Sequence, residues 1–102
     1  MALIPLAMAR RQAVRHAQKM CPPQILALLT YKRDRGVVIH CLAENAYKVC
    51  EYGFVHDTIV VSEERLGKLL KTIIKREFPR SHKVRLLKLA SPGELPIHVH
   101  CH

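Results

Sequence analysis

A stretch in the second half of the chain combines a helical apolar pattern with a high density of positive charge. Between Arg65 and Lys88 there are nine Lys or Arg residues and one acid, Glu77. Apolar residues recur in its first half at the spacing that places them on one face of a helix: Leu66, Leu69, Leu70, Ile73 and Ile74. A helix that buries this face presents its cations on the other, so we expect a folded domain with one strongly basic face.

Length and composition are those of a single small domain. The chain has 102 residues, of which 49% are hydrophobic, and a formal net charge of +9. It contains no Trp and two Phe, so its core must be largely aliphatic. We expect residues 1–21 to form a basic arm or helix and residues 22–102 to form one compact α/β domain, because a chain of this size supports a single hydrophobic core.

Proline and glycine divide the chain into short segments of different character. Residues 7–20 predict a basic helix that ends before Pro22, and residues 24–32 fit either a buried strand or a helix. The β-branched segments 37–41 and 58–61 predict strands. Residues 43–52 predict a short helix closed by Gly53, and residues 63–77 predict a longer helix after an N-cap at Ser62. Residues 83–89 and 97–101 predict two further strands.

This order of elements predicts a two-layer α/β sandwich of βαβαββ type, with both helices on one face of a mixed sheet. The order resembles that of small nucleic-acid-binding domains such as the Alba family and the C-terminal domain of translation initiation factor 3, although no motif matches residue by residue. A winged helix-turn-helix, with a first helix at residues 23–32, is the alternative. It would require nine residues, 53–61, as a turn that normally takes three or four, so we rank it second.

The basic stretch predicts binding to a polyanion. Phosphate backbones are bound by several long cationic side chains on a scaffold, each of which displaces condensed counterions. No predicted strand carries the paired aromatics of a base-stacking sheet, so we expect backbone contacts with weak sequence specificity. We therefore predict a nucleic-acid-binding protein, with RNA slightly favoured over DNA. Its contacts would come from Arg65, Lys68, Lys71, Lys75, Arg76, Arg80, Lys83 and Arg85, with a second, weaker contribution from Arg10, Arg11 and Arg15.

Histidines near the C-terminus indicate a second kind of site. On a strand, His98 and His100 share one face, and His40 alternates in the same way with Val38 on its own strand. Imidazole is a common zinc ligand, so these three histidines are candidate ligands in a metal-binding protein or a metal-dependent enzyme. An edge strand with solvent-facing histidines explains the same pattern without a metal. No phosphate-binding loop, carboxylate pair or nucleophile–base motif is present, so no catalytic residue is predicted.

The remaining expectations concern partners and compartment. An edge strand at 97–101 would permit a homodimer by strand pairing, and the cations could alternatively dock an acidic protein. The four cysteines show no tight spacing and the chain has no secretory signal, so a reduced cytoplasmic compartment is the simplest interpretation. The acid-free first 33 residues leave an organellar transit peptide as the alternative. The apolar run at residues 1–8 is too short to span a bilayer, so no membrane partner is expected.

Overall fold

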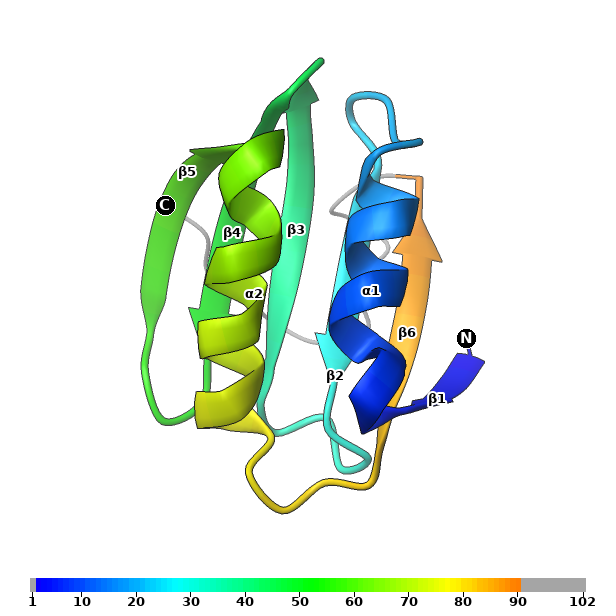
Figure 1. The fold of residues 1–102 in the computed structure, drawn as a ribbon, viewed down its shortest axis with the longest axis vertical. Coiled ribbons are helices and arrows are strands. Elements are labelled where there is room, and N and C mark those ends of the chain that lie inside the picture. Colours follow the sequence, from blue (N-terminus) through cyan, green and yellow to red (C-terminus); the bar gives the residue numbers. More distant parts are fainter. Residues whose placement is uncertain (1, 91–102) are drawn as a thin grey trace.

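The computed structural model describes residues 2–90, which form six strands and two helices (Figure 1). The strands pair in the order β1-β6-β2-β3-β4-β5, and every neighbouring pair is antiparallel. Both helices lie side by side on one face of this sheet, which gives the two-layer α+β sandwich that the sequence predicts. In chain order the elements are β1 (Ala2–Pro5), α1 (Leu6–Ala17), β2 (Ile25–Leu29), β3 (Gly36–Ala43), β4 (Ala46–Tyr52), β5 (Asp57–Ser62), α2 (Glu63–Glu77) and β6 (Lys83–Leu89).

One predicted helix is wrong. Most of residues 43–52 form β4, the second strand of a hairpin in which Cys41 lies opposite Tyr47. Tyr47 and Val49 pack beneath the helices while Cys50 packs on the opposite face of the sheet, and this period of two belongs to a strand. The sheet is therefore antiparallel across all six described strands rather than mixed. Without a helix between β3 and β5, the element order no longer matches the βαβαββ domains.

The ambiguous segment at residues 24–32 contains β2, so the winged helix-turn-helix is also excluded. All five residues of β2 are buried: Leu26 and Leu28 pack with the helices, and Ile25, Ala27 and Leu29 pack on the other face. A strand buried on both faces reads as a continuous apolar run, which is why periodicity alone did not identify it. The strand predicted at 97–101 lies outside the described residues.

Two narrow apolar stripes attach the helices to the sheet. On α1 the stripe consists of Ala9, Ala13 and Ala17, whose small side chains let the helix approach the strands closely. On α2 the buried residues are larger: Leu66, Leu70, Ile73 and also Glu77. Burying each large aliphatic side chain stabilises the fold by about 1.5–3 kcal/mol. The N-terminal segment predicted as an arm or helix thus contributes α1 to the same core as the rest of the domain.

The start of α2 is held by the β3–β4 hairpin. Ser62 occupies the predicted N-cap position, but its side chain makes no capping hydrogen bond. The amide Oδ1 of Asn45 instead accepts a hydrogen bond of 2.8 Å from the backbone N–H of Glu63. Asn45 sits in the hairpin turn with a φ of 62°, a conformation that Asn tolerates better than most residues. The capping group therefore comes from a segment 18 residues away in sequence.

Tyr47 links the same hairpin to the end of α1. Its buried phenol donates a hydrogen bond of 2.9 Å to the backbone carbonyl of Ala17, in the last turn of the helix. Carbonyls in the last turn lack intrahelical partners, so this bond satisfies a group that would otherwise be partly unpaired. Burial raises the pKa of the Tyr47 phenol, so it remains a donor at neutral pH.

Replacing Tyr47→Phe should lower the free energy of unfolding by about 0.5–1.5 kcal/mol, because one buried hydrogen bond is lost while the ring is kept. Urea unfolding followed by circular dichroism measures this change. The matched control is Tyr31→Phe, since the Tyr31 side chain is 67% exposed, and it should leave stability unchanged. Equal stability of the Tyr47→Phe variant and the wild type would contradict the proposed link.

Candidate nucleic-acid interface

A groove separates the exposed faces of the two helices. It encloses about 490 Å³ and is lined by Arg10, Arg11, Val14 and Arg15 of α1, by Gln18 just after that helix, and by Gly67 of α2. The two helices are packed together at Gly67, where a Cβ atom would lie 3.6 Å from Cγ2 of Val14. Because Gly67 has no side chain, the groove stays open above this contact. Three arginines thus border a shallow concave surface on the helical layer.

Helix geometry explains why the arginines of α1 gather there. The buried alanines occupy one side of the helix, so the arginines between them are turned towards solvent. All three arginines are exposed, and Arg11 and Arg15 are four residues apart and therefore neighbours on the helix surface. No acidic residue occurs within α1, so nothing on the helix itself neutralises this charge.

The lysines of α2 form the other side of this basic surface. Lys68, Lys71 and Lys75 are exposed and recur at three- and four-residue spacing, opposite the buried stripe. Lys71 follows Gly67 by four residues, which places it on the groove side of the helix. Arg65 is exposed one turn closer to the helix start, where Glu63 and Glu64 reduce the local positive charge. We call this set the basic helical face: Arg10, Arg11, Arg15, Arg65, Lys68, Lys71 and Lys75.

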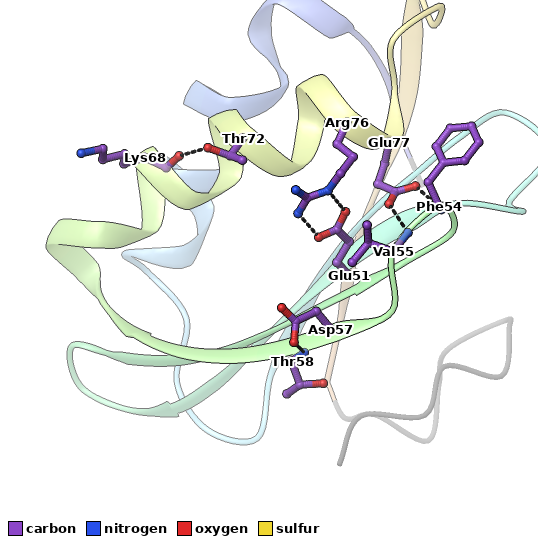
Figure 2. A network of polar contacts seen from close by, with 9 residues as sticks. All are labelled: Glu51, Phe54, Val55, Asp57, Thr58, Lys68, Thr72, Arg76 and Glu77. Atoms are coloured by element: carbon purple, nitrogen blue, oxygen red, sulfur yellow. Dashed lines mark hydrogen bonds and ion pairs between the residues drawn. The ribbon is translucent and has the colours of Figure 1, made fainter.

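Arg76 belongs to a different set of contacts, drawn in Figure 2. Its Nε donates a hydrogen bond of 2.7 Å to Oε2 of Glu51, and its Nη2 donates one of 2.5 Å to Oε1 of the same carboxylate. Burial is the largest single influence on the Glu51 carboxyl and raises its pKa. The hydrogen bonding with Arg76 and Glu77 and the charge of Arg76 together outweigh burial, so the pKa is lowered. The side chain of Arg76, which the sequence predicts to contact phosphate, is therefore engaged in an internal ion pair with Glu51 of β4.

The remaining residues predicted to contact phosphate are Arg80, Lys83 and Arg85, and the last two lie on the face of the sheet opposite the helices. Val84 and Leu86 of β6 pack beneath the helices, so Lys83 and Arg85, which alternate with them, point to the opposite face. Arg85 also donates a hydrogen bond of 2.9 Å to the carbonyl of Tyr31 and stacks 4.6 Å from the centre of its ring. Arg80 is exposed in the loop between α2 and β6. Four of the eight predicted residues, Arg65, Lys68, Lys71 and Lys75, are thus exposed on α2, in the same layer as the arginines of α1. The other four lie elsewhere: Arg76 in an ion pair, Arg80 in a loop, and Lys83 and Arg85 on the opposite face of the sheet.

The metal hypothesis concerns residues on the other side of the sheet. His40 lies on β3, half-buried, in alternation with Val38, which packs on the face opposite the helices. Burial, and then the charge of Lys48, lowers the pKa of the His40 imidazole, and its buried Nε2 has no hydrogen-bond partner. His98 and His100 lie outside the described residues. Within residues 2–90 there is no cluster of three or more metal-ligating side chains, so zinc binding stays a prediction.

The cysteines differ from the expectation of uniformly reduced thiols. Cys50 is disulfide-bonded, whereas Cys21 and Cys41 are free. Cys41 is buried, and burial raises the pKa of its thiol, which makes it a poor nucleophile at neutral pH.

The most informative residue that the sequence did not identify is Glu77, the single acid of the basic stretch. It is fully buried, and its two carboxylate oxygens accept hydrogen bonds of 2.9 Å from Phe54 N–H and 3.1 Å from Val55 N–H (Figure 2). The preceding Gly53 has a φ of 138°, and any side chain there would collide with the same carboxylate. Glu77 therefore anchors the β4–β5 loop to the end of α2. Its four-residue spacing from Ile73 continues the buried stripe, which is the signal that could have revealed it.

The titration of Glu77 should make stability depend on pH. Burial, and then the contact with Glu51, raises the pKa of Glu77 above its ordinary value of 4.5. The folded protein then binds this proton more tightly than the unfolded chain does, so the stabilising contribution of Glu77 is present at low pH and falls as the pH rises above about 4.5. The pKa of Glu51 is shifted in the opposite direction, so Glu51 titrates below this window.

We therefore expect the free energy of unfolding of the wild type, relative to that of a Glu77→Gln variant, to decrease as the pH rises above about 4.5. Urea unfolding at a series of pH values measures this difference. Glu64→Gln, a substitution at an exposed acid in the same helix, should show no such trend. A difference between the wild type and Glu77→Gln that does not change with pH would refute the raised pKa.

Replacing Gly67→Ala tests the geometry of the groove floor. The new methyl group would make an ordinary van der Waals contact with Val14, so no clash opposes the higher helix propensity of Ala. We expect the free energy of unfolding to rise by about 0.5–1 kcal/mol, measured by urea unfolding. A loss of stability would show that the helices are packed more tightly at this point than the structure indicates.

Comparison with known proteins adds no assignment. No protein-family model, curated protein or solved structure matches the chain. Neither of the two helices in residues 2–90 has the length and apolar character needed to cross a membrane. What the protein does must therefore be inferred from the basic helical face and the groove within it.

Proposed function

We propose that this protein binds the phosphate backbone of a nucleic acid, RNA slightly in preference to DNA, along the groove between α1 and α2. The observation that carries the proposal is the groove itself, which is lined by three arginines on α1 and by Gly67 of α2. Lys71, one helical turn beyond Gly67, is exposed beside it. Cations on two adjacent helices can approach one phosphate strand from both sides. Arginine suits bidentate contacts to phosphate oxygens, and lysine acts as a point charge.

The charge on this face is largely uncompensated. Among the acids of α2, Glu77 is buried, and Glu63 lies at the helix start, where its backbone N–H is bound by Asn45. Glu64 is the exposed acid of that helix, and α1 has none. A fixed array of cations of this kind attracts a polyanion and releases its condensed counterions on binding.

The size of the face fits a short length of backbone. Arg65 and Lys75 are about 15 Å apart along the helix axis, at a rise of 1.5 Å per residue. In a duplex each strand advances about 3.4 Å per phosphate, so this row spans about four phosphates. With the arginines of α1, about four to seven phosphate contacts are available. This number predicts a steep dependence of affinity on salt.

The aromatic side chains favour backbone contacts over base reading. Tyr47 and Phe78 are buried in the core. The exposed rings of Tyr31 and Phe54 are each covered by an arginine, Arg85 and Arg35, at 4.6 and 4.5 Å from the ring centre. None of these rings lines the groove. Base stacking therefore has no platform there, and we expect weak sequence specificity.

A pair of charge-reversal variants tests the proposal. The groove variant carries Arg11→Glu, Lys68→Glu and Lys71→Glu. The matched control carries Lys32→Glu, Arg80→Glu and Lys83→Glu, which change the net charge by the same amount at exposed positions outside the groove. Fluorescence anisotropy with labelled RNA and DNA duplexes of one sequence, from low to physiological salt, gives the affinity of each.

The wild type should bind with a log–log salt slope of about −4 to −6 on duplex DNA. In the groove variant the affinity should fall at least about tenfold and the slope should flatten by about 2–3, because three phosphate contacts are removed. The control should keep the wild-type slope. Equal losses in both variants would mean that net charge attracts the nucleic acid without the groove. Absence of binding even at low salt would leave an acidic protein as the partner of these cations.

A further inference from the structure

The two edges of the sheet are built differently. β1, at one edge, is four residues long and ends at Pro5. β5, at the other edge, is six residues long and pairs with β4 without a bulge, from Asp57 opposite Glu51 to Ser62 opposite Ala46. β5 is the edge strand beside α2 in Figure 1, and no strand in residues 2–90 pairs with its outer side. Among the described residues, its outward N–H and C=O groups thus have no strand partner.

Apart from the charge of Asp57 at its start, β5 has none of the features that usually protect an edge strand from pairing. Such strands commonly carry Lys, Pro, an inward charge or a bulge. The four central residues of β5, Thr58 to Val61, are uncharged and β-branched, which favours further strand pairing. Ile59 is 38% exposed and Val60 is 63% exposed, on opposite faces of the sheet. An exposed apolar edge of this kind indicates a docking surface.

We propose that a second copy of this chain pairs with β5 as an antiparallel strand, with a two-fold axis at Val60, and that the two sheets become one. An axis perpendicular to the sheet keeps the helices of both copies on the same face. In this register Val60 lies opposite the partner's Val60. Ile59 lies opposite the partner's Val61, and Thr58 lies opposite the partner's Ser62.

The register favours a second copy over an unrelated strand, because β5 is complementary to itself. On the helical face Ile59 lies opposite the partner's Val61, so these pairs are apolar. On the other face Val60 lies opposite the partner's Val60, and the hydroxyl of Thr58 lies opposite that of the partner's Ser62. Asp57, at the start of the strand, comes opposite the partner's Glu63, one position beyond these five, and salt should screen the repulsion between these two acids. A register centred on Ile59 would place Thr58 opposite the partner's Val60 and Asp57 opposite the partner's Val61, so the register centred on Val60 keeps more apolar pairs.

The dimer would extend the helical layer. Because α2 packs on β4 and β5, the two copies of α2 would be neighbours across the axis. Each protomer has a formal charge of +9, so their repulsion opposes the association and should be screened by salt. Dimerisation should therefore persist or strengthen as salt rises, whereas binding to nucleic acid should weaken. The dimer does not depend on the proposed function, and it is measured without nucleic acid.

Sedimentation velocity of the full chain over a range of concentration and salt tests the proposal. The wild type should shift towards twice its mass of 11.7 kDa. Val60→Lys, which places like charges against each other at the axis, should remain monomeric at concentrations at which the wild type is dimeric. Leu3→Lys is the matched control, because it adds the same charge at an exposed residue, 48% accessible, on the other edge strand. This control should dimerise like the wild type.

A wild type that stays monomeric up to about 1 mM would overturn the proposal, since an association that weak has no role at cellular concentrations. A dimer that survives Val60→Lys would overturn it as well, because the contact would then lie elsewhere. Circular dichroism of each variant verifies that the fold is retained.

Cross-linking tests the register independently. In a Cys21→Ser background, which removes the exposed free thiol, Val60→Cys should give a covalent dimer under mild oxidation. Ser62→Cys is the control, because the two copies of position 62 would lie about 13 Å apart, four residues along the strands. Equal cross-linking of both variants would contradict the register centred on Val60.

Discussion

The attachment of both helices to the same face of the sheet, by two narrow apolar stripes, determines where every charge on the helical layer can lie. The stripe of α1 is made of alanines and that of α2 of larger aliphatic residues, and each occupies only one side of its helix. Lysine and arginine cannot be buried without a partner, so the remaining positions must face solvent. Since the two helices lie side by side, the arginines of α1 line a groove that Gly67 of α2 also lines, and the exposed lysines of α2 belong to the same helical layer.

Two buried acids near the end of α2 have different roles, and one of them removes a cation from the surface that a partner could contact. Glu51 takes up Arg76 in a bidentate ion pair, and Glu77 is used to hold the β4–β5 loop at the end of α2. The surface that a partner can contact therefore carries fewer available cations than the formal charge of the stretch from Arg65 to Lys88 implies. The same acids tie the end of α2, the helix that carries three lysines of this surface, to β4 and to the β4–β5 loop.

The parts of the fold that depend on local pattern were predictable. The helical period of residues 63–77 and the β-branched segments around Val38 and Val60 correspond to α2, β3 and β5. β4 was not predictable in this way, because Ala43, Ala46, Tyr47 and Cys50 fit a helical spacing while Tyr47, Val49 and Glu51 fit a strand. The segment forms a strand because it pairs with β3, and this contact is not visible in the local sequence pattern.

In the candidate site, too, the features that depend on local pattern were predictable and those that depend on long-range contacts were not. The lysines of α2 follow from the helical pattern, and the structure keeps them on one face. The engagement of Arg76 depends on Glu51, which is 25 residues away, and the position of Arg85 depends on which face of β6 is turned towards the helices. The groove itself requires the contact between Gly67 and Val14, two positions that no local pattern connects.

The central claim, that the groove between α1 and α2 contacts a phosphate backbone, is tested most directly by following the backbone amide resonances during titration with a short RNA duplex. The account predicts that the largest chemical-shift changes fall on residues 10–18 and 67–75 and that they disappear at high salt. Changes centred instead on Lys83, Arg85 and the loop around Lys32, with the two helices unaffected, would contradict it.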